Sequence, residues 1–194
     1  MGHTMSEKDD IRKALLDERL LLSEERVHTC SRATQERLLK SPYWPKSGRV
    51  GLYAAVKNEI LTHDLFQRAL EQGLHVYFPR VEQGIRFYEV NGPEELRRGS
   101  WSIPEPIPDC PILSEEDNHR LDLLVVPGIG FTRDGFRVGY GKGFYDQYLG
   151  KYAARCVGLA YDFQIVDGFS KDSWDKPLSA VVTEKAIYKA KEAH

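Results

Sequence analysis

The segment Val125–Leu149, VVPGIGFTRDGFRVGYGKGFYDQYL, contains most of the residues of this chain that could do chemistry on an anion. It holds six glycines, and Arg137 and Lys142 lie among them. Glycines let backbone N–H groups approach an anion without a Cβ in the way, and the N-terminus of a following helix adds partial positive charge. Asp146, at the start of that helix, could hold a divalent cation against phosphate oxygens. The pattern predicts a nucleotide-phosphate site.

The spacing within this segment matches neither of the two common phosphate-loop motifs. Lys142 is followed by Gly143, and Phe136 stands at the first glycine position, which excludes a Walker A loop. The last glycine of a dinucleotide fingerprint would fall on Phe144, which excludes that motif as well. The plain alternative is a surface turn, but a turn needs only one or two special glycines. A phosphate loop of another kind is the better interpretation.

The composition is typical of an ordinary globular protein. The 194 residues are 41% apolar and 29% charged, with 27 basic and 29 acidic side chains and a net charge of −2. We therefore expect one domain over residues 1–194 and no nonspecific binding of nucleic acid. We also expect a monomer, because no heptad pattern is visible. Met1–Thr4 are treated as an added extension before Met5.

Targeting and redox signals favour the cytoplasm. No apolar run reaches the roughly 18 residues of a membrane span, and the start, MGHTMSEKDD, lacks the apolar core of a secretory signal. The three cysteines, Cys30, Cys110 and Cys156, are far apart and odd in number, which favours reduced thiols over disulfides or a zinc site. We expect a cytoplasmic protein with no membrane partner.

Strand and helix patterns alternate along the chain. Two helices are expected within residues 1–40, the second capped by Ser23 and stopped by Ser41-Pro42. Later strands are expected at 49–56, 75–78, 85–90, 121–126, 156–160 and 178–182, and later helices at 62–72, after Gly143, and as a short last helix. Residues 94–113, rich in proline, are expected to form a long ordered loop. This order predicts a three-layer, Rossmann-like α/β fold, whose mostly parallel sheet has helices on both faces and binds ligands at the carboxyl ends of its strands.

Residues 126–149 resemble the signature of the 5-formyltetrahydrofolate cyclo-ligase family, whose members are also called methenyltetrahydrofolate synthetases. Shorter matches follow the family's order along nearly the whole chain: Lys8-x-x-Ile-Arg12, Tyr53-x-x-x-x-Asn-Glu59-x-x-Thr62, Phe78-Pro-Arg80, Ser102-Ile-Pro-Glu-Pro106 and Val181-Val-Thr-Glu184.

The activity that the resemblance implies is the ATP- and magnesium-dependent closure of 5-formyltetrahydrofolate to 5,10-methenyltetrahydrofolate, with release of ADP and phosphate. Phosphorylation would turn the formyl oxygen, a poor leaving group, into phosphate, after which the N10 nitrogen attacks the activated carbon. Such a reaction asks the protein mainly for positioning and charge stabilisation. ATP is then a co-substrate and Mg²⁺ the cofactor.

The resemblance assigns residues to the phosphate end of the site. Arg137 and Lys142 are the expected catalytic cations, and Asp146 and Asp175 are the expected magnesium ligands. The ATP-binding set is Lys8, Arg12, Arg137, Val138, Gly139, Tyr140, Gly141, Lys142, Gly143, Phe144 and Tyr145. Lys8 and Arg12 share one helix face, where two like charges repel unless an anion lies between them. Without the resemblance, they would be a solvated basic face and Asp175 an ordinary loop residue.

The resemblance also assigns the folate end. Glu59 is expected to bond the N–H donors of the pterin ring, Ala54 to line its pocket and Trp101 to cover the folate. The substrate-binding set is Ala54, Glu59, Trp101, Tyr140, Gly141, Lys142, Gly143 and Phe144. On its own, Glu59 would be a surface or helix-start carboxylate, and the aromatic side chains after Gly139 would face the core as readily as a ligand.

Three positions depart from the family's pattern. Leu61 stands where the family commonly has an acidic residue, Trp174 stands where a histidine often precedes Asp175, and Ser179 stands where many members have aspartate. These departures concern the contacts to folate and metal, not the class of reaction.

Two other functions stay open at this point. A different phosphoryl-transferring enzyme on the same fold would keep the glycine-rich segment and Lys142 but need not keep Glu59. A non-catalytic folate or nucleotide binder would not require a magnesium-clamped triphosphate. The simultaneous presence of four charged residues disfavours it, namely Arg137, Lys142, Asp146 and Asp175.

Overall fold

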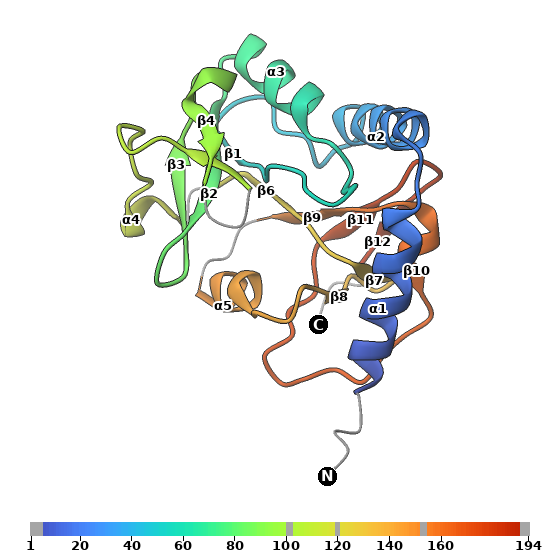
Figure 1. Cartoon of the computed structure of the whole chain (residues 1–194). Helices are drawn as coiled ribbons and strands as arrows, with labels where there is room; N and C mark the ends of the chain where they lie inside the picture. The colour runs from blue at the N-terminus through green and yellow to red at the C-terminus, as the bar shows by residue number, and fades with distance from the viewer. Residues whose placement is uncertain (1–5, 100–102, 119–120, 152–154, 191–194) are drawn as a thin grey trace.

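The computed structural model describes residues 6–99, 103–118, 121–151 and 155–190, and a seven-stranded sheet runs through them (Figure 1). Its strand order is β12-β11-β9-β6-β1-β2-β3. The strands are β1 (Arg49–Gly51), β2 (His75–Val81), β3 (Ile85–Glu89), β6 (Leu123–Val126), β9 (Cys156–Leu159), β11 (Ala180–Val182) and β12 (Ile187–Lys189). The five inner strands are parallel, and the edge strands β3 and β12 are antiparallel to their neighbours. The prediction of a mostly parallel sheet is confirmed.

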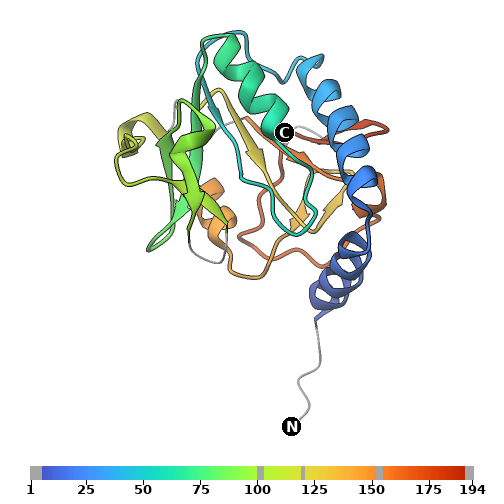
Figure 2. The same ribbon diagram turned by 45° about the horizontal axis from the view of Figure 1, so that its top comes forward.

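Helices cover both faces of this sheet. Helices α2 (Glu24–Leu39) and α3 (His63–Glu71) lie side by side on one face, and α5 (Phe144–Lys151) lies on the other (Figures 1 and 2). The predicted three-layer α/β architecture is therefore confirmed. Within the described ranges, no helix is long and apolar enough to cross a membrane.

Strand β6 shows how the sequence produces these layers. All four of its residues are buried. Leu123 and Val125 belong to the hydrophobic cluster that contains Leu38 of α2 and Leu65 of α3. Leu124 and Val126 belong to the cluster that contains Tyr148 of α5. A strand that is buried on both faces has a continuous apolar sequence rather than an alternating one, as this one does.

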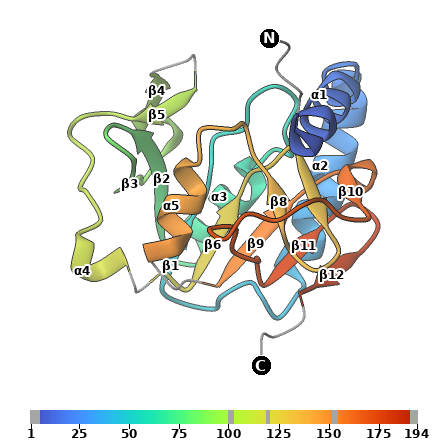
Figure 3. The same cartoon turned by 90° about the horizontal axis from the view of Figure 1, so that it is seen from below.

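Helix α1 (Glu7–Leu20) lies beside a small second sheet, β10-β7-β8, and forms the expected N-terminal pair with α2 (Figure 3). A capping box of Ser6 and Asp9 begins the helix. Leu15 and Arg19 are its only buried residues, so the helix is held by polar contacts as much as by apolar packing. The small sheet consists of β7 (Gly130–Thr132), β8 (Arg137–Val138) and β10 (Ile165–Val166).

The predicted last helix is wrong, because a hairpin forms in its place. The hydroxyl of Thr183 accepts hydrogen bonds from the N–H groups of Lys185 and Ala186, at 3.2 and 3.0 Å, and stabilises a tight turn. The chain then returns as β12, antiparallel to β11. The three residues of β12 are too few to nucleate a helix in water, whereas they complete the edge of an existing sheet.

Two strand boundaries and the proline-rich segment also differ from expectation. Strand β1 ends at Gly51, and β2 continues through Pro79. Pro79 lies beyond Tyr77, the last residue of β2 that pairs with β1, so its missing N–H removes no hydrogen bond to β1. The expected loop at 94–113 instead contains short elements, which are η1 (Pro93–Glu95) and the hairpin of β4 (Leu96–Arg98) with β5 (Pro104–Pro106), and α4 (Glu115–Asn118) follows it.

Phe131 of β7 fills the space that two glycines leave beside the end of β6. Its ring is fully buried, and a Cβ added at Gly128 or Gly158 would lie 2.5 or 2.6 Å from it. We expect Phe131→Ala to lower the free energy of unfolding by about 3–5 kcal/mol, because it removes a buried ring and leaves a cavity. Urea denaturation measures the change. Leu21→Ala, at a side chain that is 86% exposed, should cost less than about 0.5 kcal/mol. Equal losses in the two variants would contradict this packing argument.

Candidate active site

Strands β1 and β6 are neighbouring parallel strands from which the chain turns in opposite directions. After β1 it continues to β2 and β3 on one side, and after β6 it continues to β9 and β11 on the other. In open α/β sheets, ligands bind in the crevice beyond the carboxyl ends of such a pair. Residues 52–62, which we call the β1 loop, leave the sheet here, and so do residues 127–143, which we call the glycine segment. The two segments that the sequence singled out therefore begin at one place.

The β1 loop is folded tightly by its own hydrogen bonds. The hydroxyl of Tyr53 donates to the carbonyl of Ile60 at 2.7 Å, and the hydroxyl of Thr62 donates to the carbonyl of Tyr53 at 2.6 Å. Lys57 and Asn58, at the tip, have left-handed backbone angles, with φ of 51° and 57°. The amide of Asn58 donates to two carbonyl groups at the end of α1, which fixes the loop against that helix. The loop thus has one defined shape.

Glu59 is held inside this loop as a buried acid. Its carboxyl group is 4% exposed, and it accepts hydrogen bonds from the N–H of Val56 at 3.0 Å and from the hydroxyl of Tyr140 at 2.9 Å. Burial raises the pKa of Glu59, while the charge of Arg19 and these two hydrogen bonds act to lower it. A buried carboxylate with good donors around it suits the recognition of N–H groups on a ligand.

Arg19 completes this cluster, and the sequence interpretation missed it. Its guanidinium group is 1% exposed and lies 4.0 Å from the carboxylate of Glu59. It also donates to the hydroxyl of Tyr140, which is the residue of the glycine segment that contacts Glu59. One signal could have found it: positions 8, 12, 15 and 19 share one face of a helix, so Arg19 continues the face of Lys8 and Arg12.

The glycine segment has the backbone that its composition predicts. Gly141 and Gly143 have left-handed φ angles of 88° and 69°, a conformation that side chains disfavour. Helix α5 begins directly after Gly143, so its free N–H groups lie at the end of the segment. Lys142 is exposed between these two glycines. Val138 is a buried strand residue, paired with Gly130 of β7, and can face a ligand only with its backbone.

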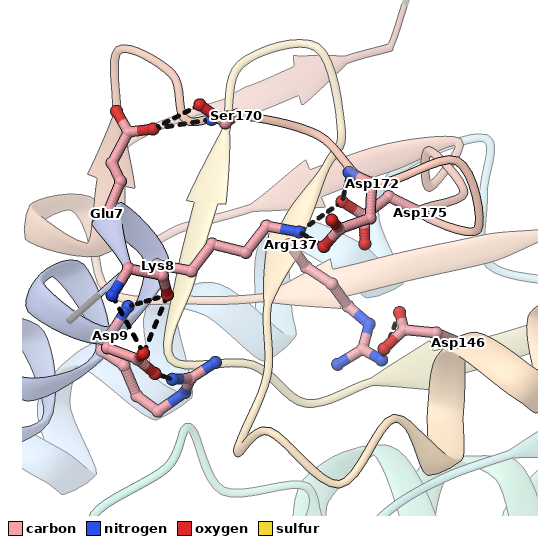
Figure 4. A network of polar contacts seen from close by, with 10 residues as sticks. Glu7, Lys8, Asp9, Arg137, Asp146, Ser170, Asp172 and Asp175 are labelled. Atoms are coloured by element: carbon pink, nitrogen blue, oxygen red, sulfur yellow. Dashed lines mark hydrogen bonds and ion pairs between the residues drawn. The ribbon is translucent and has the colours of Figure 1, made fainter. Parts of the chain in front are cut away.

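Arg137 and Asp146 face each other across this segment (Figure 4). A guanidinium nitrogen of Arg137 donates to the carboxylate of Asp146 at 2.8 Å, and the side chain of Arg137 is only 5% exposed. The Nε of Arg137 is buried and has no hydrogen-bond partner. Its guanidinium carbon also lies 5.4 Å from the ring centre of Tyr145. A buried cation with a donor still unused is suited to a further anion.

Lys8 extends from α1 to the segment that carries Asp175 (Figure 4). Its ammonium group lies 2.6 Å from a carboxylate oxygen of Asp172 and 2.6 Å from one of Asp175. Burial lowers the pKa of Lys8, but the two carboxylates outweigh it and raise the pKa. Arg12 donates to the carbonyl of Gly139 at 2.8 Å and pairs with Asp9. Carboxylates of the chain itself therefore accompany both Lys8 and Arg12.

The remaining predicted residues lie around these groups or outside the described part. Ala54 is partly buried and packs against the core beneath the β1 loop. Phe144 and Tyr145 are partly buried at the start of α5. Trp101 lies outside the described residues. The departures Trp174 and Ser179 differ in exposure, since Trp174 is 63% exposed whereas Ser179 is partly buried. The hydroxyl of Ser179 accepts a hydrogen bond from the N–H of Cys156.

The two acidic side chains expected to bind magnesium are each paired with a cation, Asp146 with Arg137 and Asp175 with Lys8. Among the residues that the structure describes, no three His, Cys, Asp or Glu side chains form a group that could hold a metal ion. A metal here would need oxygen ligands that the protein alone does not supply.

Comparison with known proteins assigns the family. The sequence model of the 5-formyltetrahydrofolate cyclo-ligase family matches residues 4–184. The chain is 29% identical over 180 residues to the 5-formyltetrahydrofolate cyclo-ligase of Escherichia coli strain K12, covering 88% of this chain and 96% of that protein. It is 29% identical over 182 residues to the mouse (Mus musculus) 5-formyltetrahydrofolate cyclo-ligase, covering 86% and 87%.

A solved structure agrees with this assignment. The NMR structure of the 5,10-methenyltetrahydrofolate synthetase of Aquifex aeolicus is similar with a TM-score of 0.84 and 34% sequence identity, over 96% of this chain and 94% of that one. The chain belongs to the 5-formyltetrahydrofolate cyclo-ligase family, and the resemblance seen in its motifs is confirmed.

The left-handed backbone at Gly143 gives a test of the glycine segment. Gly143→Ala should lower the free energy of unfolding by about 1–2 kcal/mol, because alanine disfavours this conformation. Gly150→Ala is the matched control, since Gly150 lies in α5 and an added Cβ meets no atom within 4 Å. It should raise the free energy of unfolding by roughly 0.5–1 kcal/mol. Urea denaturation of both variants checks the pair, and shifts of the same sign would contradict the assigned backbone.

Proposed function

We propose that this chain catalyses the ATP- and magnesium-dependent closure of 5-formyltetrahydrofolate to 5,10-methenyltetrahydrofolate, releasing ADP and phosphate. Family membership supports the reaction. The observation that carries it to this chain's own residues is the 2.9 Å hydrogen bond between Tyr140 and Glu59. It joins the segment suited to phosphates directly to the buried carboxylate suited to a pterin. Two substrates of these classes would lie next to each other at the β1–β6 crevice.

The chemistry divides into two displacements. The formyl oxygen on N5 attacks the γ-phosphorus of ATP, and the bond from that phosphorus to ADP breaks. The N10 nitrogen then attacks the formyl carbon and loses its proton, the carbon–oxygen bond breaks, and phosphate leaves with the former formyl oxygen. Negative charge on the transferring group must be stabilised in the first step, and two nitrogen atoms must be held close to one carbon in the second.

Arg137 and Lys142 are the catalytic residues in this proposal. They neutralise charge on the transferred phosphoryl group, while the N–H groups of Gly139, Gly141 and Gly143 and the start of α5 bind its oxygens. The unpartnered Nε of Arg137 supports this role. Val138, Tyr140, Phe144 and Tyr145 complete the ATP-binding set through backbone groups and ring packing.

Lys8 and Arg12 bind the other phosphates of ATP. Both already contact carboxylates of the chain. When the nucleotide binds, its phosphates replace these carboxylates as the anionic partners of the two cations. Arg12 also donates to the carbonyl of Gly139, which supports a position next to the glycine segment.

Glu59 binds the N–H donors of the pterin, and Ala54 lines the same pocket. The backbone of Gly141, Lys142 and Gly143, together with Tyr140 and Phe144, forms the side of the folate site that faces ATP. We also keep Trp101 as a cover for the folate. Burial of Glu59 supports this assignment, because a carboxylate in a low-dielectric pocket distinguishes strongly between donors and acceptors on a ligand.

The donor set fits a magnesium ion that arrives with the nucleotide. Mg²⁺ is usually held by one or two carboxylates together with substrate phosphates, rather than by a site made of protein alone. Asp146 and Asp175 would be those carboxylates, and their present pairing with cations is what a charge-balanced site needs before the ion arrives. The ion would supply neutralisation of charge on the phosphate oxygens.

The wider assignment follows from the same proposal. Residues 1–194 act as one domain, since the large sheet takes strands from both halves of the chain. The partners are ATP and the folate, with no nucleic acid or membrane involved, and the enzyme works as a monomer in the cytoplasm. The three cysteines are free buried thiols, which fits a reducing compartment.

The direct test is to mix the protein with 5-formyltetrahydrofolate and MgATP and follow the absorbance of methenyltetrahydrofolate. Growth of the signal that requires both ATP and magnesium supports the proposal. No growth while ATP is still bound or hydrolysed would move the question to another acceptor.

Lys142→Ala should lower turnover by at least about 100-fold, because it removes a charge from the transferring phosphoryl group. The Kd for 5-formyltetrahydrofolate without ATP should stay nearly unchanged. Lys151→Ala, at the other end of α5, is the control and should retain full turnover. More than about a tenth of the wild-type rate in Lys142→Ala would contradict its catalytic role.

Asp175 and Asp172 form a matched pair for the metal, because both contact Lys8 at 2.6 Å. Asp175→Asn should raise the magnesium concentration needed for half-maximal rate by at least about tenfold, as loss of a metal contact does. Asp172→Asn should leave it nearly unchanged. If both variants shift the magnesium requirement equally, the effect acts through Lys8 and Asp175 is not a ligand.

A further inference from the structure

Arg19 is the most deeply buried cation near the site, and its burial requires an explanation. It is 1% exposed and is among the largest fully buried side chains of the described residues. A buried charge is costly unless it is paired and hydrogen-bonded, and an arginine cannot lose its proton to escape that cost. The hydrogen bonds that Arg19 must keep therefore also fix the positions of the groups that accept them.

Those contacts come from all the segments that form the crevice. Nε donates to the carbonyl of Lys57 in the β1 loop at 3.0 Å, and Nη1 donates to the carbonyl of Gly128 after β6 at 2.9 Å. Nη2 donates to the hydroxyl of Tyr140 in the glycine segment. One planar group thus bonds the β1 loop and both ends of the glycine segment at the same time.

The direction of these hydrogen bonds is set by chemistry. A guanidinium group can only donate, so the oxygen of Tyr140 must accept from Arg19. The hydroxyl proton of Tyr140 is then directed to Glu59, whose Oε1 accepts it at 2.9 Å. Arg19, Tyr140 and Glu59 therefore form a chain with one possible sense, in which each hydrogen bond polarises the next.

We propose that Arg19 is a positioning residue for folate binding: through Tyr140 and the β1 loop, it holds the carboxylate of Glu59 in a fixed position beside the glycine segment. Arg19 acts through Glu59 and need not contact either substrate. This inference rests on the proposed function.

The charges around Glu59 agree with this role. Burial raises the pKa of Glu59, and Arg19 is the largest influence that lowers it. The charged and titratable groups that face Glu59 are Arg19 of α1, Tyr53 and Lys57 of its own segment, Tyr140 of the glycine segment and Tyr145 of α5. Only Arg19 and Lys57 among them are cations, and Lys57 is exposed. Without Arg19, Glu59 would take up its proton at a higher pH.

The test compares Arg19→Gln and Arg19→Lys with the wild type in steady-state kinetics for both substrates. Arg19→Gln should raise the KM for 5-formyltetrahydrofolate by at least about tenfold, the usual effect of losing a charged hydrogen-bond partner. The KM for ATP and kcat should change by less than about threefold, since the phosphate ligands remain. The acid limb of kcat/KM for the folate should move to higher pH. Arg19→Lys keeps the charge, so the acid limb of kcat/KM should stay near its wild-type pH. The KM for the folate should return only partly toward the wild-type value.

Arg37→Gln is the matched structural control. Arg37 of α2 also donates to two backbone carbonyls, those of Thr183 and Glu184, but lies outside the proposed site. It should lower the melting temperature without changing either KM or the pH limb. If Arg19→Gln behaves like Arg37→Gln, or raises both KM values equally without moving the pH limb, Arg19 is only structural and the inference is overturned.

Tyr140→Phe keeps the proposal testable if Arg19→Gln fails to fold. Tyr140 is 38% exposed, so removing its hydroxyl should spare the fold while breaking the chain between Arg19 and Glu59. The variant should raise the KM for the folate and move its acid limb upward, and an unchanged limb would overturn the inference. A wild type that forms no methenyltetrahydrofolate would overturn the proposed function itself, which separates the two failures.

Discussion

The placement of β1 beside β6 is the constraint on which the site depends. Because the two strands are parallel and the chain leaves them in opposite directions, the segments that follow both open at one crevice. A buried acid reaches that crevice from one side and a glycine-rich backbone from the other. If the two strands were separated by one more strand, roughly 5 Å would be added between these groups, and the hydrogen bond from Tyr140 to Glu59 could not form.

Charge balance is the second feature that runs through the site. Four cations at the site are matched by acceptors of the chain: Lys8 by two aspartates, Arg12 by Asp9 and a carbonyl, Arg137 by Asp146, and Arg19 by carbonyls, a hydroxyl and Glu59. Such matching lets buried charges persist without a ligand. On the proposed function, magnesium and nucleotide then arrive together, so the ion offsets part of the negative charge that the phosphates bring.

Much of this arrangement could be predicted from local sequence. The apolar run of β6, the glycines after it and the Ser23 cap of α2 are local signals, and they correctly predict the buried strand, the turns of the glycine segment and the second helix. The predictions that were wrong or incomplete concern residues whose structure is determined by long-range contacts. The strand β12 exists because β11 offers it an edge, and the burial of Arg19 depends on carbonyls 38 and 109 residues away. No short sequence pattern indicates partners that lie so far away along the chain.

The most direct measurement follows the formyl oxygen. Wild-type protein is given MgATP and 5-formyltetrahydrofolate labelled with ¹⁸O in the formyl group, and the released phosphate is analysed by mass spectrometry. The account predicts that one labelled oxygen appears in phosphate for each methenyltetrahydrofolate formed, since the formyl oxygen attacks the γ-phosphorus at the crevice. Unlabelled phosphate, with the label lost to water, would contradict phosphorylation of the folate and with it the adjacency of the two sites.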